Sequence, residues 1–80
     1  MERSQILAEI RRIIEDTADI DPSEITESCA MMDDLDLSSM EVMTMVAELE
    51  DTFSIRIPEN ELRSFITVAD LADYLEKRLA

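Results

Sequence analysis

The sequence predicts an all-α protein: a small bundle of three main helices plus one short helix, with a long loop between the first two. The chain has 80 residues, no Gly and only two Pro, and these two residue types are the least compatible with helix interiors. Apolar residues recur at spacings of three and four in three separate segments, which is the repeat of an amphipathic helix. At this length we expect residues 1–80 to form a single domain.

The first helix is expected from about Ser4 to Thr17, where apolar residues follow the helical repeat. Its apolar stripe consists of Ile6, Leu7, Ile10, Ile13 and Ile14. The segment from Asp19 to Leu37 is rich in acidic and hydroxyl side chains, which indicates a loop, and Pro22-Ser23-Glu24 suggests a short turn within it. A loop of this length in a compact domain is often functional.

The second helix is expected from Ser38 to Phe53. Its start has the sequence Ser38-Ser39-Met40-Glu41, which fits a capping box: the oxygen of the first serine accepts a hydrogen bond from a backbone N–H of the first turn. The side chains expected to face the core are those of Val42, Met45, Val46, Leu49 and Phe53.

The rest of the chain is expected to add one short helix and one longer helix. Residues 55–57 look extended, because Pro58 disfavours helix in the residue before it. A short helix can follow from Pro58 to about Phe65, and Thr67 is a candidate cap for the last helix. The inward side chains of that helix are expected to be Val68, Leu71, Ala72, Leu75 and Leu79.

The residue types that the chain lacks exclude several classes of site. Without His it has no imidazole base, no His-containing catalytic triad and no His ligand for zinc. Without Gly it cannot form the P-loop or the Rossmann fingerprint, whose backbones pass close to phosphates. Cys29 is the only cysteine, so no internal disulfide can form, and we expect a cytoplasmic protein. We interpret Cys29 as a half-buried structural thiol, because no basic residue neighbours it in the sequence.

The chain has 7 basic and 20 acidic residues and a formal net charge of −13. This charge opposes binding to nucleic-acid phosphates and to anionic membrane surfaces. No apolar run approaches the length of a transmembrane helix, and the acidic start does not resemble a signal peptide. We therefore expect a monomer that binds neither nucleic acid nor membrane and whose partners have basic surfaces.

The second helix has an additional apolar stripe. Met40, Met43 and Ala47 cluster about 140° from the core stripe, so they cannot share its contacts fully. Glu41 and Glu48 border them. Methionines beside carboxylates suit a surface that adapts to different protein partners. The alternative is that the last helix or the long loop covers these methionines.

The segment from Asp33 to Asp51 contains seven acidic residues and no basic residue. Asp34 and Asp36 extend the acidic surface from the second helix into the loop. The segment predicts a docking surface for a basic partner or a weak cation site with loose divalent binding, although a run of charges is commonly only a solvated face. It does not fit a calcium loop, because an EF-hand that began at Asp34 would have Ser39 in place of Gly and Met45 in place of Glu. We expect no specific metal site.

No arrangement of side chains predicts catalysis. Paired carboxylates can act as acid and base, but the sequence indicates no pocket, no electrophile and no base that would activate Ser39. We therefore expect that the protein is not an enzyme and that any reaction at Ser39 needs a partner enzyme.

The segment from Asp34 to Glu41, Asp-Leu-Asp-Leu-Ser-Ser-Met-Glu, resembles the attachment motif of acyl carrier proteins, which reads D-L-G-x-D-S-L. The resemblance covers nearly the whole chain: an Ile-rich first helix, a long loop, an acidic second helix with Ile57-Pro58 after it, and the later helices. The chain departs from the motif at three positions, with Asp36 for Gly, Ser38 for Asp and Met40 for Leu.

The resemblance implies a carrier of acyl groups for fatty-acid, polyketide or related lipid biosynthesis. Alignment of the motifs puts 4′-phosphopantetheine, which holds the acyl group as a thioester, on Ser39; a register shift of one residue would put it on Ser38. The implied partners are a phosphopantetheinyl transferase and acyl-transferring, condensing or modifying enzymes with basic docking surfaces. The docking residues are expected to be Asp34, Asp36, Met40, Glu41, Met43, Ala47 and Glu48.

Two alternatives stay open. A carrier of aminoacyl or peptidyl groups belongs to the same class, whereas an acidic helical adaptor would never be modified and would use its surface alone. If the chain is an acyl carrier, a crevice for the acyl group is expected among Met45, Val46, Leu49, Ile57 and Ala72.

Overall fold

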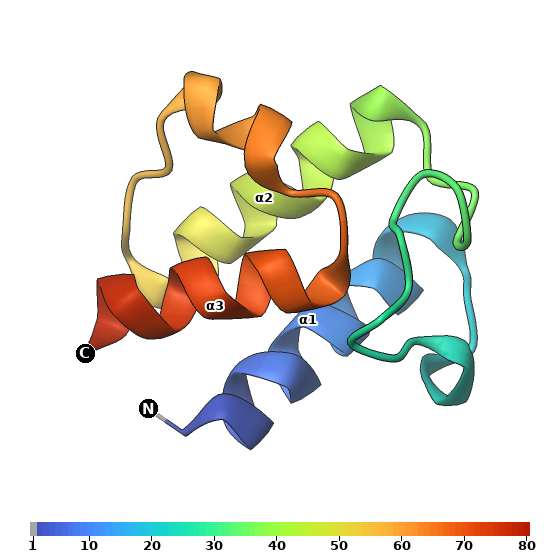
Figure 1. Cartoon of the computed structure of the whole chain (residues 1–80), viewed down its shortest axis with the longest axis horizontal. Coiled ribbons are helices and arrows are strands. Elements are labelled where there is room, and N and C mark those ends of the chain that lie inside the picture. The colour runs from blue at the N-terminus through green and yellow to red at the C-terminus, as the bar shows by residue number, and fades with distance from the viewer. Residues whose placement is uncertain (1) are drawn as a thin grey trace.

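The computed structural model describes residues 2–80, and it is helical as expected (Figure 1). Three α-helices form the bundle: α1 (Arg3–Ala18), α2 (Ser39–Phe53) and α3 (Val68–Leu79). Two 3₁₀ helices lie in the connections: η1 (Pro22–Glu24) and η2 (Glu59–Ser64). The long loop and the short helix between α2 and α3 are thus confirmed, and the short helix has 3₁₀ geometry.

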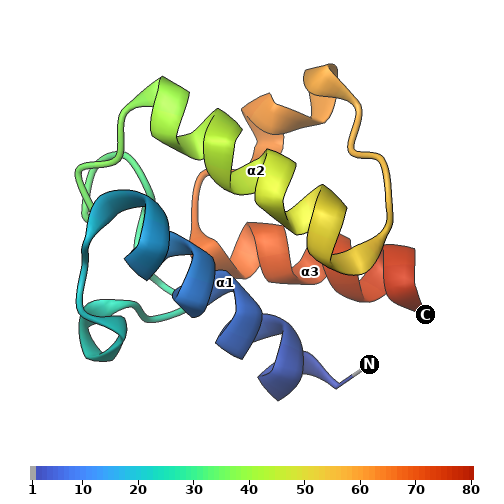
Figure 2. The same ribbon diagram turned by 180° about the vertical axis from the view of Figure 1, so that it is seen from behind.

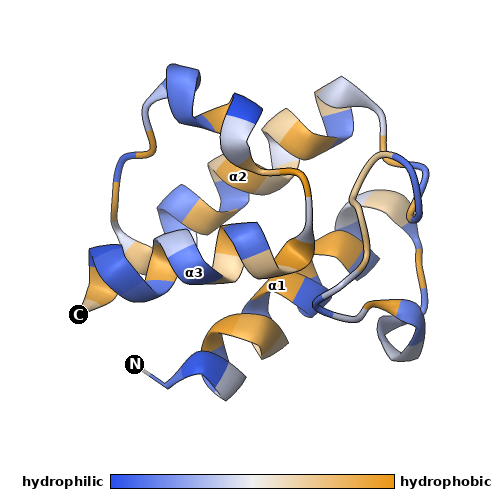
Figure 3. Ribbon diagram, viewed as in Figure 1, coloured by the Kyte–Doolittle hydropathy of each residue, from blue (hydrophilic) through white to orange (hydrophobic). Residues whose placement is uncertain are grey.

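The apolar faces of the three α-helices meet in one core. α1 packs against both α2 and α3, and Figures 1 and 2 show this arrangement from opposite sides. Apolar positions on α1 and α3 lie on the sides that face the other helices (Figure 3). The buried stripes are those expected, except that Phe53 and Leu79 are only partly buried. Each of these two residues is the last of its helix, where fewer neighbours surround the side chain.

The loop between α1 and α2 is held against the start of α3 by backbone pairing. An isolated antiparallel bridge joins Ala30 to Thr67. The flanking hydrogen bonds run from Met31 N to Ile66 O (2.9 Å), from Val68 N to Cys29 O (3.0 Å) and from Ala69 N to Glu27 O (2.9 Å). η1 forms the turn that the sequence suggested. This pairing satisfies backbone groups of the loop that would otherwise lie unpartnered beside the core.

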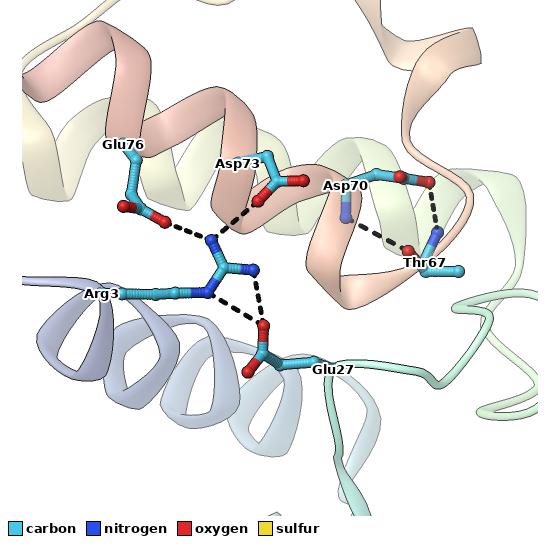
Figure 4. A network of polar contacts seen from close by, with 6 residues as sticks. All are labelled: Arg3, Glu27, Thr67, Asp70, Asp73 and Glu76. Carbon is cyan, nitrogen blue, oxygen red and sulfur yellow. Dashed lines mark hydrogen bonds and ion pairs between the residues drawn. The ribbon is translucent and has the colours of Figure 1, made fainter.

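A charged network joins the same loop to the first and last helices (Figure 4). Arg3, the first residue of α1, donates hydrogen bonds to Glu27 in the loop and to Asp73 and Glu76 on α3. The distance from Arg3 Nε to Glu27 Oε1 is 2.9 Å and that from Arg3 Nη1 to Asp73 Oδ1 is 2.7 Å. These contacts raise the pKa of Arg3, with the hydrogen bond to Glu27 as the largest cause. One side chain thereby connects three segments that are distant in sequence.

α3 begins with the cap expected at Thr67. Thr67 Oγ1 accepts a hydrogen bond from Asp70 N (3.1 Å), and Asp70 Oδ2 accepts one from Thr67 N (3.0 Å), as Figure 4 shows. The backbone hydrogen bond from Thr67 is the main reason that the pKa of Asp70 is lowered. In the part of the chain that the structure describes, no helix combines the length and the apolar character needed to cross a membrane.

Candidate functional site

Ser39 is the first residue of α2, and its side chain is exposed. The chain reaches it through Leu37, which is buried and whose N–H donates to Met31 O at 3.1 Å. The start of α2 is therefore held by the loop segment that pairs with α3. Within residues 2–80 the Ser39 hydroxyl takes part in no hydrogen bond, so its oxygen is available for reaction.

The neighbouring hydroxyl of Ser38 has a structural role. Ser38 Oγ accepts a hydrogen bond from Glu41 N (3.1 Å), and Ser38 N donates to Glu41 Oε1 (2.9 Å). The predicted capping box is confirmed. The two adjacent serines thus differ in their environment. Ser38 caps the helix, whereas the hydroxyl of Ser39 has no hydrogen-bond partner in the described part of the chain.

The additional apolar stripe of α2 faces solvent. Met40 is 75% exposed and Met43 is 50% exposed, and Ala47 and Glu48 are exposed on the same helix. Glu41 is half-buried, which agrees with its part in the capping box. The alternative that α3 or the loop covers these methionines is therefore wrong: α3 and the loop pack elsewhere on the core.

The two acidic loop residues precede α2 and are both exposed. Asp34 Oδ2 accepts a hydrogen bond from Ala30 N at 2.8 Å, so this carboxylate also stabilises the loop. Asp36 has a φ of 57°, in the left-handed region. Among residues 2–80, carboxylate and thiol groups do not gather into a cluster of three or more that could hold a metal ion.

A groove opens beside Ser39, between the first half of α2 and η2, with a volume of about 790 Å³. We call it the α2–η2 groove. Its lining includes Met32 from the loop, Ser39, Val42 and Met43 from α2, and Leu62 and Arg63 from η2. Periodicity did not indicate Met32 or Arg63, because one lies in a loop and the other in a 3₁₀ helix.

The crevice for the acyl group that the sequence predicts stays a prediction. Its five residues are all core side chains, each less than a tenth exposed, and none lines the α2–η2 groove. A buried apolar position and a cavity-lining one have the same spacing in the sequence, so periodicity could not distinguish them.

Cys29 lies away from this groove and is half-buried, as predicted. Its Sγ is 3.2 Å from Thr26 Oγ1 and 3.6 Å from Glu24 O, in hydrogen-bond contact with both. These contacts hold the thiol within its own loop.

Comparison with known proteins adds independent information. A family model described as "Phosphopantetheine attachment site" matches residues 8–75. An acyl carrier protein of Rhodococcus erythropolis is 32% identical over 75 residues, which cover 94% of this chain and 82% of that protein. A meromycolate extension acyl carrier protein of Mycobacterium leprae is 36% identical over 75 residues, covering 94% of this chain and 65% of that protein.

A solved structure shares the fold. The acyl carrier protein from Enterococcus faecalis superimposes with a TM-score of 0.78 at 32% identity, covering 96% of this chain and 98% of that one. The resemblance seen in the sequence is thereby confirmed. This chain belongs to the acyl carrier protein family, whose members carry acyl groups on a covalently attached phosphopantetheine.

Proposed function

We propose that Ser39 carries the 4′-phosphopantetheine and that the protein is a non-catalytic acyl carrier in lipid biosynthesis. The observation that carries this proposal is the contrast between two adjacent hydroxyls. Ser38 caps α2, whereas Ser39 is exposed, has no hydrogen-bond partner among residues 2–80 and borders a groove. The relative named for meromycolate extension supports a lipid pathway.

The start of α2 suits a phosphodiester. Ser39 and Met40 are the first two residues of the helix, and their N–H groups have no acceptor in the described residues. Free N–H groups and the helix dipole favour an anion at this position. A transferase would form a phosphodiester between Ser39 Oγ and the phosphopantetheine arm of coenzyme A. The pyrophosphate bond of coenzyme A would break, adenosine 3′,5′-bisphosphate would leave and the hydroxyl proton would be released. When bound, the terminal thiol of the arm holds the acyl group as a thioester.

Partner enzymes would dock on the exposed face at the start of α2. The proposed docking residues are Asp34, Asp36, Met40, Glu41, Met43, Ala47 and Glu48. Flexible, exposed methionines can adapt to partners of different shape, and the surrounding carboxylates attract basic surfaces. The partners are a phosphopantetheinyl transferase and enzymes that transfer, condense or modify acyl groups.

Three broader features belong to the same proposal. Residues 1–80 form one carrier domain, which the shared core of α1, α2 and α3 supports. The protein is a monomer, because a formal charge of −13 makes copies repel each other. It works in the cytoplasm, where the Cys29 thiol stays reduced.

Intact mass after co-expression with a broad-specificity phosphopantetheinyl transferase tests the attachment site. We expect one added phosphopantetheine in the unsubstituted protein and in Ser38→Ala, and none in Ser39→Ala. Ser38→Ala is the matched control, because it removes the adjacent hydroxyl and costs about 1 kcal/mol of helix-cap stability. Circular dichroism checks that both variants are folded.

Two results would contradict this proposal. Loss of the added mass only in Ser38→Ala would mean that Ser38, and not Ser39, is the attachment site. No added mass with several transferases would refute modification of this chain and favour an adaptor that works by docking alone.

A further inference from the structure

Arg63 is the one basic residue among those that line the α2–η2 groove in the described chain. The groove has two kinds of lining. Val42 is buried and Leu62 is half-buried, so they give it an apolar floor, whereas Arg63 is exposed at its η2 side. Ser39 borders the same groove. An arm attached at Ser39 therefore starts in the hollow that Arg63 also lines.

The Arg63 guanidinium is available to a ligand. Within residues 2–80 it forms no ion pair and no hydrogen bond, although the chain has 20 acidic residues. By contrast, Arg3 and Arg12 form ion pairs with carboxylates. Arg11 and Arg78 donate to backbone carbonyls.

The geometry of η2 explains why Arg63 stays unpaired. Glu59 precedes it by four residues and lines the same groove, and in an α-helix these two side chains would be neighbours. η2 is a 3₁₀ helix of three residues per turn, so residues four apart point about a third of a turn away from each other. The pair of opposite charges is present in the sequence, but the two side chains form no ion pair in the described residues, as this helix type leads us to expect.

We propose that Arg63 is an anion-binding residue for the arm attached at Ser39, an inference that rests on the proposed attachment site. The loaded arm offers two anions in this groove: the phosphodiester on Ser39, and a carboxylate at the free end of an acyl group. Both offer oxygen acceptors to the planar guanidinium. The apolar floor suits the methylene groups of a short acyl chain.

The test measures hydrogen exchange of the Arg63 Nε–H group by NMR in four forms: unmodified, phosphopantetheine-loaded, butyryl-loaded and succinyl-loaded protein. Butyryl and succinyl groups have the same number of carbons and differ by the terminal carboxylate. Arg63→Lys assigns the signal. We expect exchange in at least one loaded form to be about two- to fivefold slower than in the unmodified protein, which is the range of exposed ion pairs. Arg56 is the internal control, because it is exposed, lies outside the groove and its side chain has no partner in the described residues.

The four forms distinguish the outcomes. Slower exchange in every loaded form assigns the phosphodiester as the anion, and slower exchange only in the succinyl form assigns the carboxylate of the acyl group. Unchanged exchange in all loaded forms, or equal slowing at Arg56, overturns the proposal for Arg63. Intact mass is measured first: if Ser39 accepts no arm, both the attachment site and this inference are refuted, whereas loading without a change at Arg63 refutes only this inference.

Discussion

Asp36 has a left-handed backbone conformation, with a φ of 57°, three residues before the proposed attachment serine. Non-glycine residues are uncommon there, and Asp is among the few that tolerate it. The motif of the family has Gly at this position. The structure therefore explains why Asp36 can stand in place of Gly. The backbone here has a left-handed conformation that Gly adopts readily, and Asp adopts the same conformation while adding a carboxylate.

Replacement of Asp36 by a β-branched residue should expose this strain. We expect Asp36→Val to lower the free energy of unfolding by about 1–2 kcal/mol, because its Cβ branch crowds the backbone in the left-handed region. Asp36→Gly should change it by less than about 1 kcal/mol, since relief of strain is offset by the greater freedom of Gly in the unfolded chain. Urea denaturation measures both. Asp33→Val is the control, because Asp33 is exposed with negative φ; equal destabilisation by the two Val variants would contradict the argument.

At the scale of the element, α2 has two apolar stripes with different roles. One is in the core, with Met45 1% exposed and Leu49 fully buried. The other projects Met40 and Met43 into solvent, and Glu48 is exposed on the same helix. α2 thus contributes one apolar stripe to the core and exposes the other to solvent. Because its start is set by the capping box and by the pairing of the loop with α3, that surface has a defined position relative to Ser39.

Charge reversal on this face should weaken docking without unfolding the protein. We expect Glu48→Lys to reduce the rate at which a phosphopantetheinyl transferase modifies Ser39 by about two- to fivefold at low salt, because one exposed ion pair contributes about 0.2–1 kcal/mol. The difference should shrink as salt is added, since exposed charges are screened. Glu15→Lys on α1 is the matched control: it is exposed and changes the net charge equally. Equal slowing by both variants would indicate an effect of net charge rather than of the α2 face.

At the scale of the whole molecule, a chain with a net charge of −13 must hold three segments together against its own repulsion. The core supplies the main attraction, and the Arg3 network adds a specific connection where α1, the loop and α3 meet (Figure 4). The loop so anchored continues to Leu37 and then to Ser39. The network therefore shares no residue with the site but supports the segment that positions it.

Loss of the Arg3 network should lower thermal stability more than loss of an ion pair within one helix. We expect a larger decrease in Tm for Arg3→Gln than for Arg12→Gln, because within residues 2–80 Arg12 forms ion pairs only with Glu9 and Asp16 of its own helix. Both variants remove one positive charge, so their effect on net charge is the same. Thermal denaturation followed by circular dichroism, at low and high salt, measures the difference. An equal decrease in Tm in the two variants would show that the Arg3 network stabilises the protein no more than ion pairs within one helix do.

Much of this protein follows from the sequence alone. The three helices, their caps at Ser38 and Thr67 and the buried stripes were predictable, because they depend on helical periodicity and on contacts between residues three or four apart. The attachment motif came from the resemblance to acyl carrier proteins. Periodicity indicated a second apolar stripe with Met40 and Met43, although it left open whether another element covers that stripe. All of these are local properties of the chain.

The tertiary structure decided the features that join distant segments. The pairing of the loop with α3 and the contacts of Arg3 depend on which residues the fold brings together. The groove beside Ser39 depends on where η2 lies, and the absence of an ion pair between Arg63 and Glu59 in the described residues agrees with its 3₁₀ geometry. The residues expected to form a crevice proved to be core for the same reason: an apolar residue lines a cavity or fills one according to its neighbours in space, and periodicity contains no information about those neighbours.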